Sequence, residues 1–352
     1  MPRYAILAIN AFDYILNKTG NMLIRYRPEE VMAVIDPAKS GLTAEAVLGY
    51  GGNIPVVSSV NASLSFAPDT LVIGSAPQGG KINREYRQEI IVAINAGLDI
   101  ISGMHQFLND DPEFRSLAAE KGVRLTDLRR PPDPPHFPRG SWQNRQVPVL
   151  LVVGTDCDTG KMTTAWEMTQ RLQSKGVEAR FVGTGQTGIL LSGNGVPVDA
   201  VVADFMAGEI EYVIDQVVPE AELVVVEGQG SLLNMLYGGV TLGLLQGAMP
   251  DYLILSHDPE RKLDVSNYPM PELRALMDLH VNLIAHFKPT RFLGVNLLTK
   301  ALDEQTAMKT MQSLENKLEL PVTDLVRFGN LGLIAAVFRA VRGSNKVQPG
   351  VT

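Results

Sequence analysis

The sequence predicts two α/β domains, each built on a parallel sheet. Short apolar runs rich in β-branched residues alternate with helical patterns along the whole chain of 352 residues, as expected for strands joined by crossover helices. At roughly 150 residues per domain, this length suits two or three domains. Hydrophobic residues make up 45% of the chain and charged residues 20%, so each domain has enough apolar surface to bury a core.

Five apolar runs in the first part are predicted as strands: residues 5–9, 31–35, 71–73, 99–101 and the region near Val123. A helix is expected over about residues 83–96. A second helix is marked at both ends, because Asp111 can cap its first turn, Pro112 suits its first position and Gly122 follows its last turn. Strands that alternate with helices in this way favour a parallel sheet.

The composition changes at Arg129. Residues 129–140 hold five prolines, which fix φ and remove backbone donors, so this stretch cannot enter a sheet and is predicted to run extended over the surface. The sequence therefore predicts a first domain over residues 1–128, a linker over 129–147 and a second domain over 148–352.

The second domain is predicted to hold five strands: residues 149–153, 179–182, 223–226, 252–255 and 292–297. The first of them leads through a glycine-containing loop into a helix over about residues 159–174, which Gly176 closes. A terminal helix is expected over about residues 331–341. This order again predicts a doubly wound parallel sheet.

Charge and cysteine content narrow the class of partner. Lys and Arg number 31 against 38 Asp and Glu, a net charge of −7, which favours neither nucleic acid nor an anionic membrane surface. The one cysteine cannot form an internal disulfide and the N-terminus lacks a signal-peptide pattern, so we expect a reduced, cytoplasmic protein. No apolar run approaches the ~18 residues of a membrane span. The expected partner is a small molecule, and a homo-oligomer is possible.

The strongest functional signal is the segment G-T-D-C-D-T-G-K-M-T-T between a predicted strand and a predicted helix. In such a loop, backbone N–H groups at the helix N-terminus face an anion, glycines allow its close approach, and a lysine adds positive charge. The residues predicted to bind the phosphates of a ligand are Gly154, Thr155, Asp156, Asp158, Thr159, Gly160, Lys161, Met162, Thr163 and Thr164. A plain strand-to-helix turn is the alternative.

This loop departs from the usual phosphate-loop pattern in two ways. Five residues instead of four separate Gly154 from Gly160, and Met162 stands where a Ser or Thr hydroxyl normally meets Mg²⁺. A thioether is a poor ligand for a hard cation, although Thr163 or Thr164 could substitute. Anion binding is therefore favoured over metal-assisted cleavage of a triphosphate.

The second signal is L-V-V-V-E-G-Q-G-S, an apolar run that ends in Glu227 and two glycines. Because ligands of doubly wound sheets bind at the carboxyl ends of the strands, Glu227 is predicted to lie beside the phosphate loop as a general base or a Mg²⁺ ligand. Gln229, Gly230 and Ser231 are candidates for substrate binding. Glu227 could instead cap the next segment.

Two weaker candidates follow other predicted strands. In G-T-G-Q-T-G, the residues Gln186, Thr187 and Gly188 could offer donors to a substrate, or form only a flexible turn. Asp204 could be a Mg²⁺ ligand or a base, or the N-cap of a helix over residues 205–217.

The segment S-H-D-P-E-R also follows a predicted strand. His257 and Asp258 could move a proton, and Arg261 could orient an anionic substrate. A solvated loop is the alternative reading of the same residues.

The first domain carries fainter signals. The segment I-G-S-A-P-Q-G-G, from Ile73 to Gly80, could cradle a phosphate or a carboxylate, but it is not the dinucleotide fingerprint G-x-G-x-x-G. Asp36 gives slight support for ribose binding. His105, in S-G-M-H, is more often a packed residue than a catalyst, and a covalent role for Cys157 in the phosphate loop is disfavoured.

Together these motifs resemble a two-domain family long labelled a domain of unknown function. The resemblance covers nearly the whole chain and rests on K-T-G-N-M-L-I-R-Y, I-G-S-A-P-Q-G-G, S-G-M-H, the proline-rich linker, G-T-D-C-D-T-G-K-M-T-T, G-T-G-Q-T-G, V-E-G-Q-G-S and V-R-F-G. It implies an N-terminal Rossmann-like domain and a C-terminal P-loop domain. It also implies, since some members are described so, a D-glutamate N-acetyltransferase that uses acetyl-CoA.

The phosphate loop and the V-E-G segment also look like those of dethiobiotin synthetase, an ATP-dependent enzyme whose loop has the same spacing but a Thr after the lysine. By this resemblance Lys161 would hold phosphates, while Glu227 and Asp204 would stand where that enzyme binds Mg²⁺. Met162 is the point at which this sequence departs from it.

Three functions remain open at this stage. The first is acyl transfer from acetyl-CoA, with Glu227 or the pair of His257 and Asp258 as base and loop N–H groups as oxyanion donors. The second is an ATP-dependent carboxylate-activating enzyme with Mg²⁺ on Glu227, which Met162 argues against. The third is a nucleotide-binding regulatory module without turnover. Acetyl-CoA is thus the favoured cofactor, and ATP with Mg²⁺ is the alternative.

Overall fold

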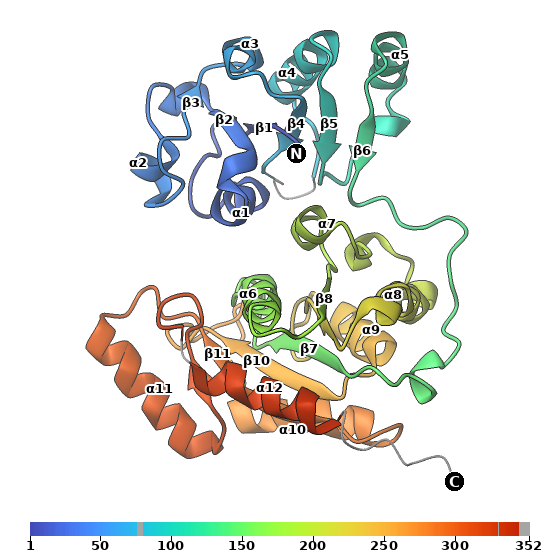
Figure 1. Cartoon of the computed structure of the whole chain (residues 1–352), viewed down its shortest axis with the longest axis vertical. Helices are drawn as coiled ribbons and strands as arrows, with labels where there is room; N and C mark the ends of the chain where they lie inside the picture. The colour runs from blue at the N-terminus through green and yellow to red at the C-terminus, as the bar shows by residue number, and fades with distance from the viewer. Residues whose placement is uncertain (76–79, 330, 345–352) are drawn as a thin grey trace. The chain divides into compact units, whose positions relative to one another are not determined.

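The computed structural model describes residues 1–75, 80–329 and 331–344. The chain divides into two compact units, Met1–Arg130 and Pro131–Thr352. Each unit contains one six-stranded sheet in which all the paired strands run parallel (Figure 1). The predicted α/β fold class with two parallel sheets is therefore confirmed.

The sheet of the first unit has the strand order β3-β2-β1-β4-β5-β6. Its strands are β1 (Tyr4–Leu7), β2 (Val31–Ile35), β3 (Val56–Val57), β4 (Thr70–Ile73), β5 (Asp99–Ser102) and β6 (Leu125–Asp127). The order reverses between β1 and β4, as in Rossmann-like sheets. Every residue of β1 and β4 is buried, which explains their continuous apolar sequences.

The helices of the first unit are α1 (Lys18–Tyr26), α2 (Ala44–Leu48), α3 (Val60–Ser63), α4 (Arg84–Asn95) and α5 (Pro112–Lys121). The ends predicted for α5 are confirmed. The Asp111 carboxylate accepts hydrogen bonds from the backbone N–H of Glu113 at 3.0 Å and of Phe114 at 3.2 Å. Gly122 follows the helix with φ 68°, the left-handed conformation that glycine adopts readily.

The sheet of the second unit has the order β12-β11-β10-β7-β9-β8. Its strands are β7 (Val149–Gly154), β8 (Ala179–Val182), β9 (Leu223–Val226), β10 (Tyr252–His257), β11 (Arg291–Leu297) and β12 (Val322–Thr323). The central strand β7 lies between β10 and β9, where the strand order reverses. Gly154 at its end pairs with Ser256 of β10, so the loop after β7 leaves the sheet at the position where such folds bind ligands.

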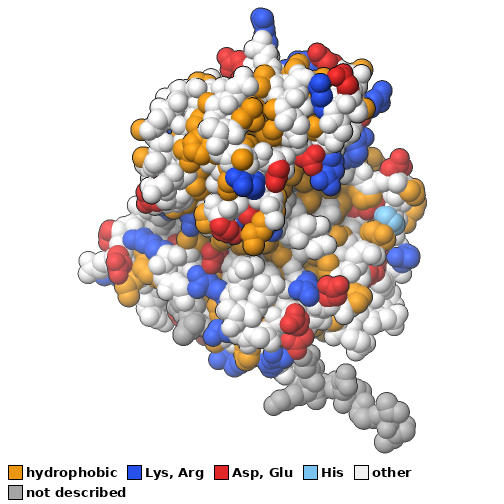
Figure 2. Space-filling view, turned by 45° about the horizontal axis from the view of Figure 1, so that its top comes forward, with side chains coloured by type: hydrophobic (Ala, Val, Ile, Leu, Met, Phe, Trp, Pro, Cys, Tyr) orange, Lys and Arg blue, Asp and Glu red, His pale blue; other side chains and the backbone are white. Residues whose placement is uncertain are grey.

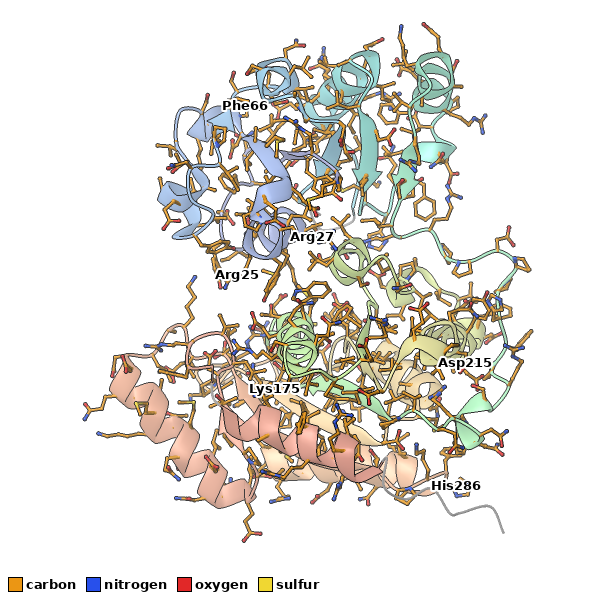
Figure 3. All side chains as sticks on the ribbon, viewed as in Figure 1. Arg25, Arg27, Phe66, Lys175, Asp215 and His286 are labelled. Carbon is orange, nitrogen blue, oxygen red and sulfur yellow. The ribbon has the colours of Figure 1, made fainter. Side chains whose placement is uncertain are left out.

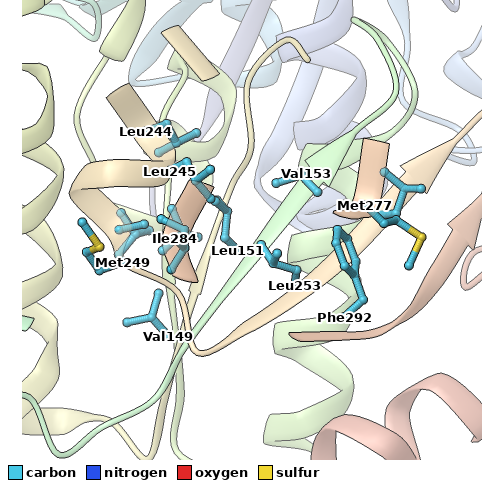
Figure 4. Close-up of a cluster of buried hydrophobic side chains, with 14 of the residues drawn as sticks. Val149, Leu151, Val153, Leu244, Leu245, Met249, Leu253, Met277, Ile284 and Phe292 are labelled. Carbon is cyan, nitrogen blue, oxygen red and sulfur yellow. The ribbon is translucent and has the colours of Figure 1, made fainter. Parts of the chain in front are cut away.

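The helices of the second unit are α6 (Lys161–Gln173), α7 (Gln186–Ser192), α8 (Ala203–Val217), α9 (Gly238–Ala248), α10 (Leu273–Ala285), α11 (Glu304–Leu318) and α12 (Leu331–Ser344). Alternate residues of the central strands share one face of the sheet. Figure 4 shows Val149, Leu151 and Val153 of β7 in a buried cluster with side chains of α9 and α10.

The proline-rich segment contains no strand or α-helix, as predicted, but it is bound to α8. The backbone N–H of His136 donates to the buried carboxylate of Glu209 at 2.7 Å. The neighbouring buried carboxylate, Glu211, accepts the backbone N–H groups of residues 139 and 141. Further along, Arg145 lies 3.3 Å from Asp215, labelled on α8 in Figure 3. Carboxylates of one helix thus fix a segment that the sequence predicted only as a linker.

Two alternatives that the sequence left open differ from the structure. Gln186, Thr187 and Gly188 form the first turn of α7 and not only a flexible turn. Asp204 was a candidate N-cap, whereas Val202 occupies that position and Asp204 is an exposed residue within the first turn of α8.

The surface is mixed in charge. Lys and Arg side chains are interspersed with Asp and Glu side chains over the face seen in Figure 2. Within the described parts of the chain, none of the helices is long and apolar enough to cross a membrane.

We expect the unfolding temperature to fall as the pH drops from 6.5 toward 4, because of His280 on α10. This side chain is fully buried, its Nδ1 lies 2.8 Å from the Leu276 carbonyl, and burial lowers the pKa of the imidazole to about 4. The unfolded chain therefore binds a proton at a pH where the folded chain does not, and about 2 kcal/mol of stability is lost by pH 5. Thermal melts at pH 7 and pH 5 measure the loss.

A His280→Leu variant cannot bind this proton, so its unfolding temperature should fall less between pH 7 and pH 5. His286, exposed at the end of the same helix (Figure 3), supplies the control. A His286→Leu variant should lose as much as the wild type. Equal losses in all three proteins would contradict the role of His280.

Candidate functional site

The loop after β7 folds over its own lysine. Gly160 precedes α6 with φ 90°, and the Nζ of Lys161 donates to the Asp156 carbonyl at 2.5 Å. The Thr159 hydroxyl donates to the same carbonyl at 3.1 Å. A Cβ on Gly154 would lie 2.8 Å from the Thr159 hydroxyl and 2.9 Å from the Lys161 Nζ, so any larger residue there would displace these side chains. The loop has the strand, turn and helix context of a phosphate site.

The two threonines in the first turn of α6, Thr163 and Thr164, differ in whether they could replace the missing metal ligand. The Thr164 hydroxyl donates to the Gly160 carbonyl at 2.9 Å and accepts from the Asn296 amide of β11 at 2.9 Å. Its hydrogen bonds therefore connect the phosphate loop to β11. Met162 is buried and offers only a thioether, while Thr163 is half-buried. The position that normally supplies a hydroxyl to Mg²⁺ therefore has no hard oxygen ligand, and the residues do not fit the usual Mg²⁺ site of a phosphate loop.

Glu227 follows β9 and is fixed by its neighbours. Its side chain is 5% exposed, and its Oε2 accepts the backbone N–H of Thr184 at 3.0 Å. The Thr184 hydroxyl donates to the Glu227 carbonyl at 2.9 Å and accepts from the Gln229 amide at 3.1 Å. The carboxylate thus bonds to the loop between β8 and α7.

The backbone after Glu227 packs against the phosphate loop. A Cβ on Gly228 would lie 1.8 Å from the Val152 carbonyl and 3.2 Å from the Lys161 Cδ. Only a residue without a side chain permits this approach. The structure therefore brings Glu227 and Lys161 to the same edge of the sheet, as the strand pattern predicts.

A Gly188→Ala variant should displace Glu227 and so lower the rate of a reaction that uses this carboxylate. The added methyl group would lie 2.2 Å from the Glu227 Oε2 and 3.0 Å from the Gly183 Cα, and such overpacking costs roughly 1–3 kcal/mol. The turnover rate should fall strongly, while the unfolding temperature should fall only slightly. Gly239→Ala, where a Cβ meets no atom within 4 Å of it in the described chain, is the control. Equal activity in both variants would mean that the position of Glu227 is not needed.

The structure places His257 and Asp258 next to different partners. The His257 Nδ1 lies 3.0 Å from the Thr155 hydroxyl in the phosphate loop, while the Asp258 carboxylate lies 3.8 Å from the Arg261 Nε. Burial lowers the pKa of His257 to about 4. The imidazole is thus neutral at pH 7, where it is a weak base and supports Thr155.

Asp156 was predicted as a phosphate-site residue, but its carboxylate is fully buried and is bound by protein groups. Arg261 donates to it at 2.9 Å, the Asn234 amide at 2.9 Å and the backbone N–H of Val265 at 2.9 Å. Arg261 also donates to the Cys157 carbonyl at 2.5 Å. Arg261, expected to orient a substrate, therefore contacts the phosphate loop itself.

Sequence reasoning missed three residues of this network: Asn234, Val265 and Asn296. It also did not foresee the contacts of Thr184 and Ser256, which lie in motifs that it singled out. Each contacts a candidate residue that is far away in the sequence, as with Asn234 and Asp156, which are 78 positions apart. Asn234 lies in S-L-L-N-M-L-Y, where its apolar neighbours give no signal of a polar site. Only the three-dimensional fold brings these groups together.

The remaining candidates are placed as follows. Gly230 takes φ 54°, and Ser231 is fully buried with a hydroxyl that finds no hydrogen-bond partner within the described ranges. Thr187 is buried and Gln186 half-buried. Asp158, in the phosphate loop, takes φ 54°. Across residues 1–75, 80–329 and 331–344, no group of three or more His, Cys, Asp or Glu side chains could hold a metal ion.

The weak candidates of the first unit have structural roles where they are described. Asp36 is fully buried, and its carboxylate accepts the backbone N–H groups of Asn10 at 3.2 Å and Phe12 at 3.3 Å, so it fixes the turn after β1. His105 is exposed, with its pKa lowered by partial burial and by Arg129. Of the segment 73–80, residues 76–79 lie outside the described residues.

Three relatives match the chain over nearly its full length. A crystal structure of a DUF1611 family protein from Anabaena variabilis has a TM-score of 0.91 at 33% identity, and the match covers 96% of this chain and 100% of that one. A protein of Tritonibacter scottomollicae named D-glutamate N-acetyltransferase is 34% identical over 338 residues, 95% of this chain and 98% of that protein. A Pseudoalteromonas protein of the same name is 29% identical over 340 residues, with the same shares covered.

Two family models match the two units. Residues 37–131 match the Rossmann-like domain of unknown function DUF1611_N, and residues 136–334 match the P-loop domain of unknown function DUF1611_C. The strand order of the first unit and the phosphate loop of the second agree with these descriptions. The chain therefore belongs to the two-domain DUF1611 family.

Proposed function

We propose that the protein is an N-acetyltransferase that moves the acetyl group of acetyl-CoA to the amine of D-glutamate or a similar D-amino acid. The observation that carries the proposal is the pairing of a buried carboxylate, Glu227, with a phosphate loop that lacks the usual oxygen ligand for Mg²⁺. Acyl transfer needs an anion site and a base, but no metal-assisted cleavage of a phosphate bond. The names of two relatives support the same activity.

The acceptor nitrogen must lose two protons in the reaction. The acceptor loses one ammonium proton to water, and its nitrogen attacks the carbonyl carbon of the thioester. As the C–N bond forms, the C=O electron pair moves to oxygen and gives a tetrahedral oxyanion. The carbonyl then re-forms as the C–S bond breaks, and the electron pair of that bond leaves with the sulfur of CoA. Glu227 takes the second proton from the nitrogen and passes it to the thiolate, so the products are the N-acetyl amino acid and a free thiol.

The residues of the site divide this work. Lys161 and the backbone N–H groups at the start of α6 bind phosphates of CoA. The hydrogen bond from Thr184 fixes the Glu227 carboxylate in one orientation, which reduces the cost of ordering a base during the reaction. Further N–H groups of the loop stabilise the oxyanion.

The test is the release of free thiol from acetyl-CoA in the presence of D-glutamate and EDTA. We expect steady release that depends on the D-amino acid, with L-glutamate as the control for the configuration of the acceptor. Release of phosphate from ATP, only with Mg²⁺ and without thiol release, would instead establish an ATP-dependent enzyme. Thermal stabilisation by a nucleotide without any turnover would establish a binding module.

A further inference from the structure

The Asp156 carboxylate joins three segments that are far apart in the sequence. Its Oδ1 accepts from the amide of Asn234, and its Oδ2 accepts from the Arg261 guanidinium and from the backbone N–H of Val265. The carboxylate is fully buried. A buried charge is stable only when it is paired and hydrogen-bonded, so these donors compensate for the burial of Asp156 and are held in place by it.

Each of the two loops is ordered around its contact with Asp156. The Asn234 Oδ1 accepts the backbone N–H groups of Leu236 at 2.9 Å and Tyr237 at 3.2 Å. In the other loop, the Asp264 carboxylate accepts the backbone N–H groups of Ser266 at 2.7 Å and Tyr268 at 2.9 Å. The Asn234 amide also lies 3.3 Å from that carboxylate, so the two loops are linked to each other as well as to Asp156.

These ordered loops present apolar side chains to solvent instead of burying them. We call this set the apolar rim: Leu233, Met235, Leu236, Tyr237, Leu263, Val265 and Tyr268, which are 43–72% exposed. Single exposed apolar side chains are common on protein surfaces, but a group of seven on two linked loops marks a binding surface. The backbone N–H of Val265 bonds directly to Asp156 of the phosphate loop, and those of Leu236 and Tyr237 bond to Asn234, whose amide bonds to Asp156. The rim therefore lies next to that loop.

Asp156 connects the rim to the phosphate-binding lysine through its own backbone. Its carbonyl accepts from the Lys161 Nζ, while its carboxylate binds both loops. We propose that Asp156 is a positioning residue, which fixes the apolar rim beside the phosphate loop so that the rim takes the uncharged pantetheine arm of CoA. This inference rests on the proposed function, because it assumes a phosphate ligand with an apolar arm.

The link between the loops is tested first without ligand, by hydrogen exchange of the backbone amides. In Asp156→Asn, exchange in residues 231–237 and 261–268 should rise at least tenfold together, while α6 stays protected. Glu260→Gln, an exposed carboxylate in the same region, is the control and should leave exchange unchanged. Unchanged exchange in Asp156→Asn, or an increase in only one loop, would overturn the link.

A second variant covers the case in which Asp156→Asn does not fold. Asn234→Ala removes one of the three donors and keeps the charge pair of Asp156 and Arg261, so it should loosen both loops by a smaller factor. An increase confined to residues 231–237 would show that Asp156 does not couple the loops.

The ligand is tested with two probes that differ only by the arm, CoA and 3′-phosphoadenosine 5′-diphosphate, which keeps all three phosphates of CoA. The wild type should bind CoA at least tenfold more tightly than 3′-phosphoadenosine 5′-diphosphate. Leu236→Ser, at a residue 63% exposed, should weaken binding of CoA severalfold and leave binding of 3′-phosphoadenosine 5′-diphosphate unchanged, whereas damage to the whole loop region would weaken both. Equal binding of the two probes by the wild type would overturn the role of the rim. If neither probe binds, the proposed function fails, while the hydrogen-exchange data still show whether Asp156 links the two loops.

Discussion

Replacing Glu227 by Gln should lower the rate of thiol release by about two to four orders of magnitude, the usual contribution of a positioned base. The substitution keeps the shape of the side chain and an oxygen that can accept the Thr184 N–H, which lies 3.0 Å from the carboxylate. It removes the negative charge that takes the proton. Binding of acetyl-CoA should therefore change little, and the loss should appear in kcat rather than in KM.

The control for this experiment is Glu220→Gln. Glu220 lies shortly before β9, its side chain is 74% exposed, and it makes only a distant ion pair of 3.6 Å with Arg180. The same change of charge there should leave both kcat and KM close to those of the wild type. A Glu227→Gln enzyme with the wild-type rate would remove Glu227 from the mechanism, and activity lost on adding EDTA to the wild type would make Glu227 a metal ligand instead of a base.

Local signals explain which elements could be predicted from the sequence. Helix α5 was predicted with its ends because Asp111 and Gly122 act on the backbone of their own neighbours. The strands β2, β8 and β9 match their apolar runs residue for residue. The phosphate loop could be found for the same reason, because Gly154 and Lys161 are close in the sequence as well as in space.

Helix α9 could not be predicted, because four of its eleven residues are glycines, which disfavour helices in isolation. Packing explains them. A Cβ on Gly247 would lie 2.6 Å from the Ala207 carbonyl of α8, and one on Gly243 would lie 2.6 Å from the Met206 sulfur. The glycines allow α8 and α9 to approach closely, and this tertiary contact outweighs the low intrinsic propensity.

The limits of prediction at the site have a different cause. The strand pattern predicted that Glu227 and Lys161 lie at one edge of the sheet, since both follow parallel strands. It could not predict that Asp156, within the same motif as Lys161, has a carboxylate bound by Arg261 and Val265, which are 105 and 109 positions away. The residue types in a motif suggest contacts with a ligand, whereas burial and partners decide whether a side chain faces the ligand or the protein.

Lys161→Ala should weaken binding of CoA or acetyl-CoA by roughly ten- to a hundredfold, the equivalent of one charge-assisted hydrogen bond of about 1.5–3 kcal/mol. The fold should remain intact, because the Asp156 carbonyl that accepts from Lys161 keeps its bond from the Thr159 hydroxyl. Ligand that binds only the folded state raises the unfolding temperature by mass action. The variant should therefore melt near the wild-type temperature alone, but gain far less from added CoA.

Lys175 provides the matched control, since it is an exposed lysine just beyond the other end of α6 (Figure 3). Lys175→Ala removes the same charge from the same region, and so changes the long-range field of the protein by a similar amount, yet it should keep the full stabilisation by CoA. A loss in both variants would mean that net charge rather than the loop attracts the ligand. Full stabilisation of Lys161→Ala would show that the segment 154–164 is a structural turn, because a phosphate bound on this loop would lie within reach of the Lys161 ammonium group.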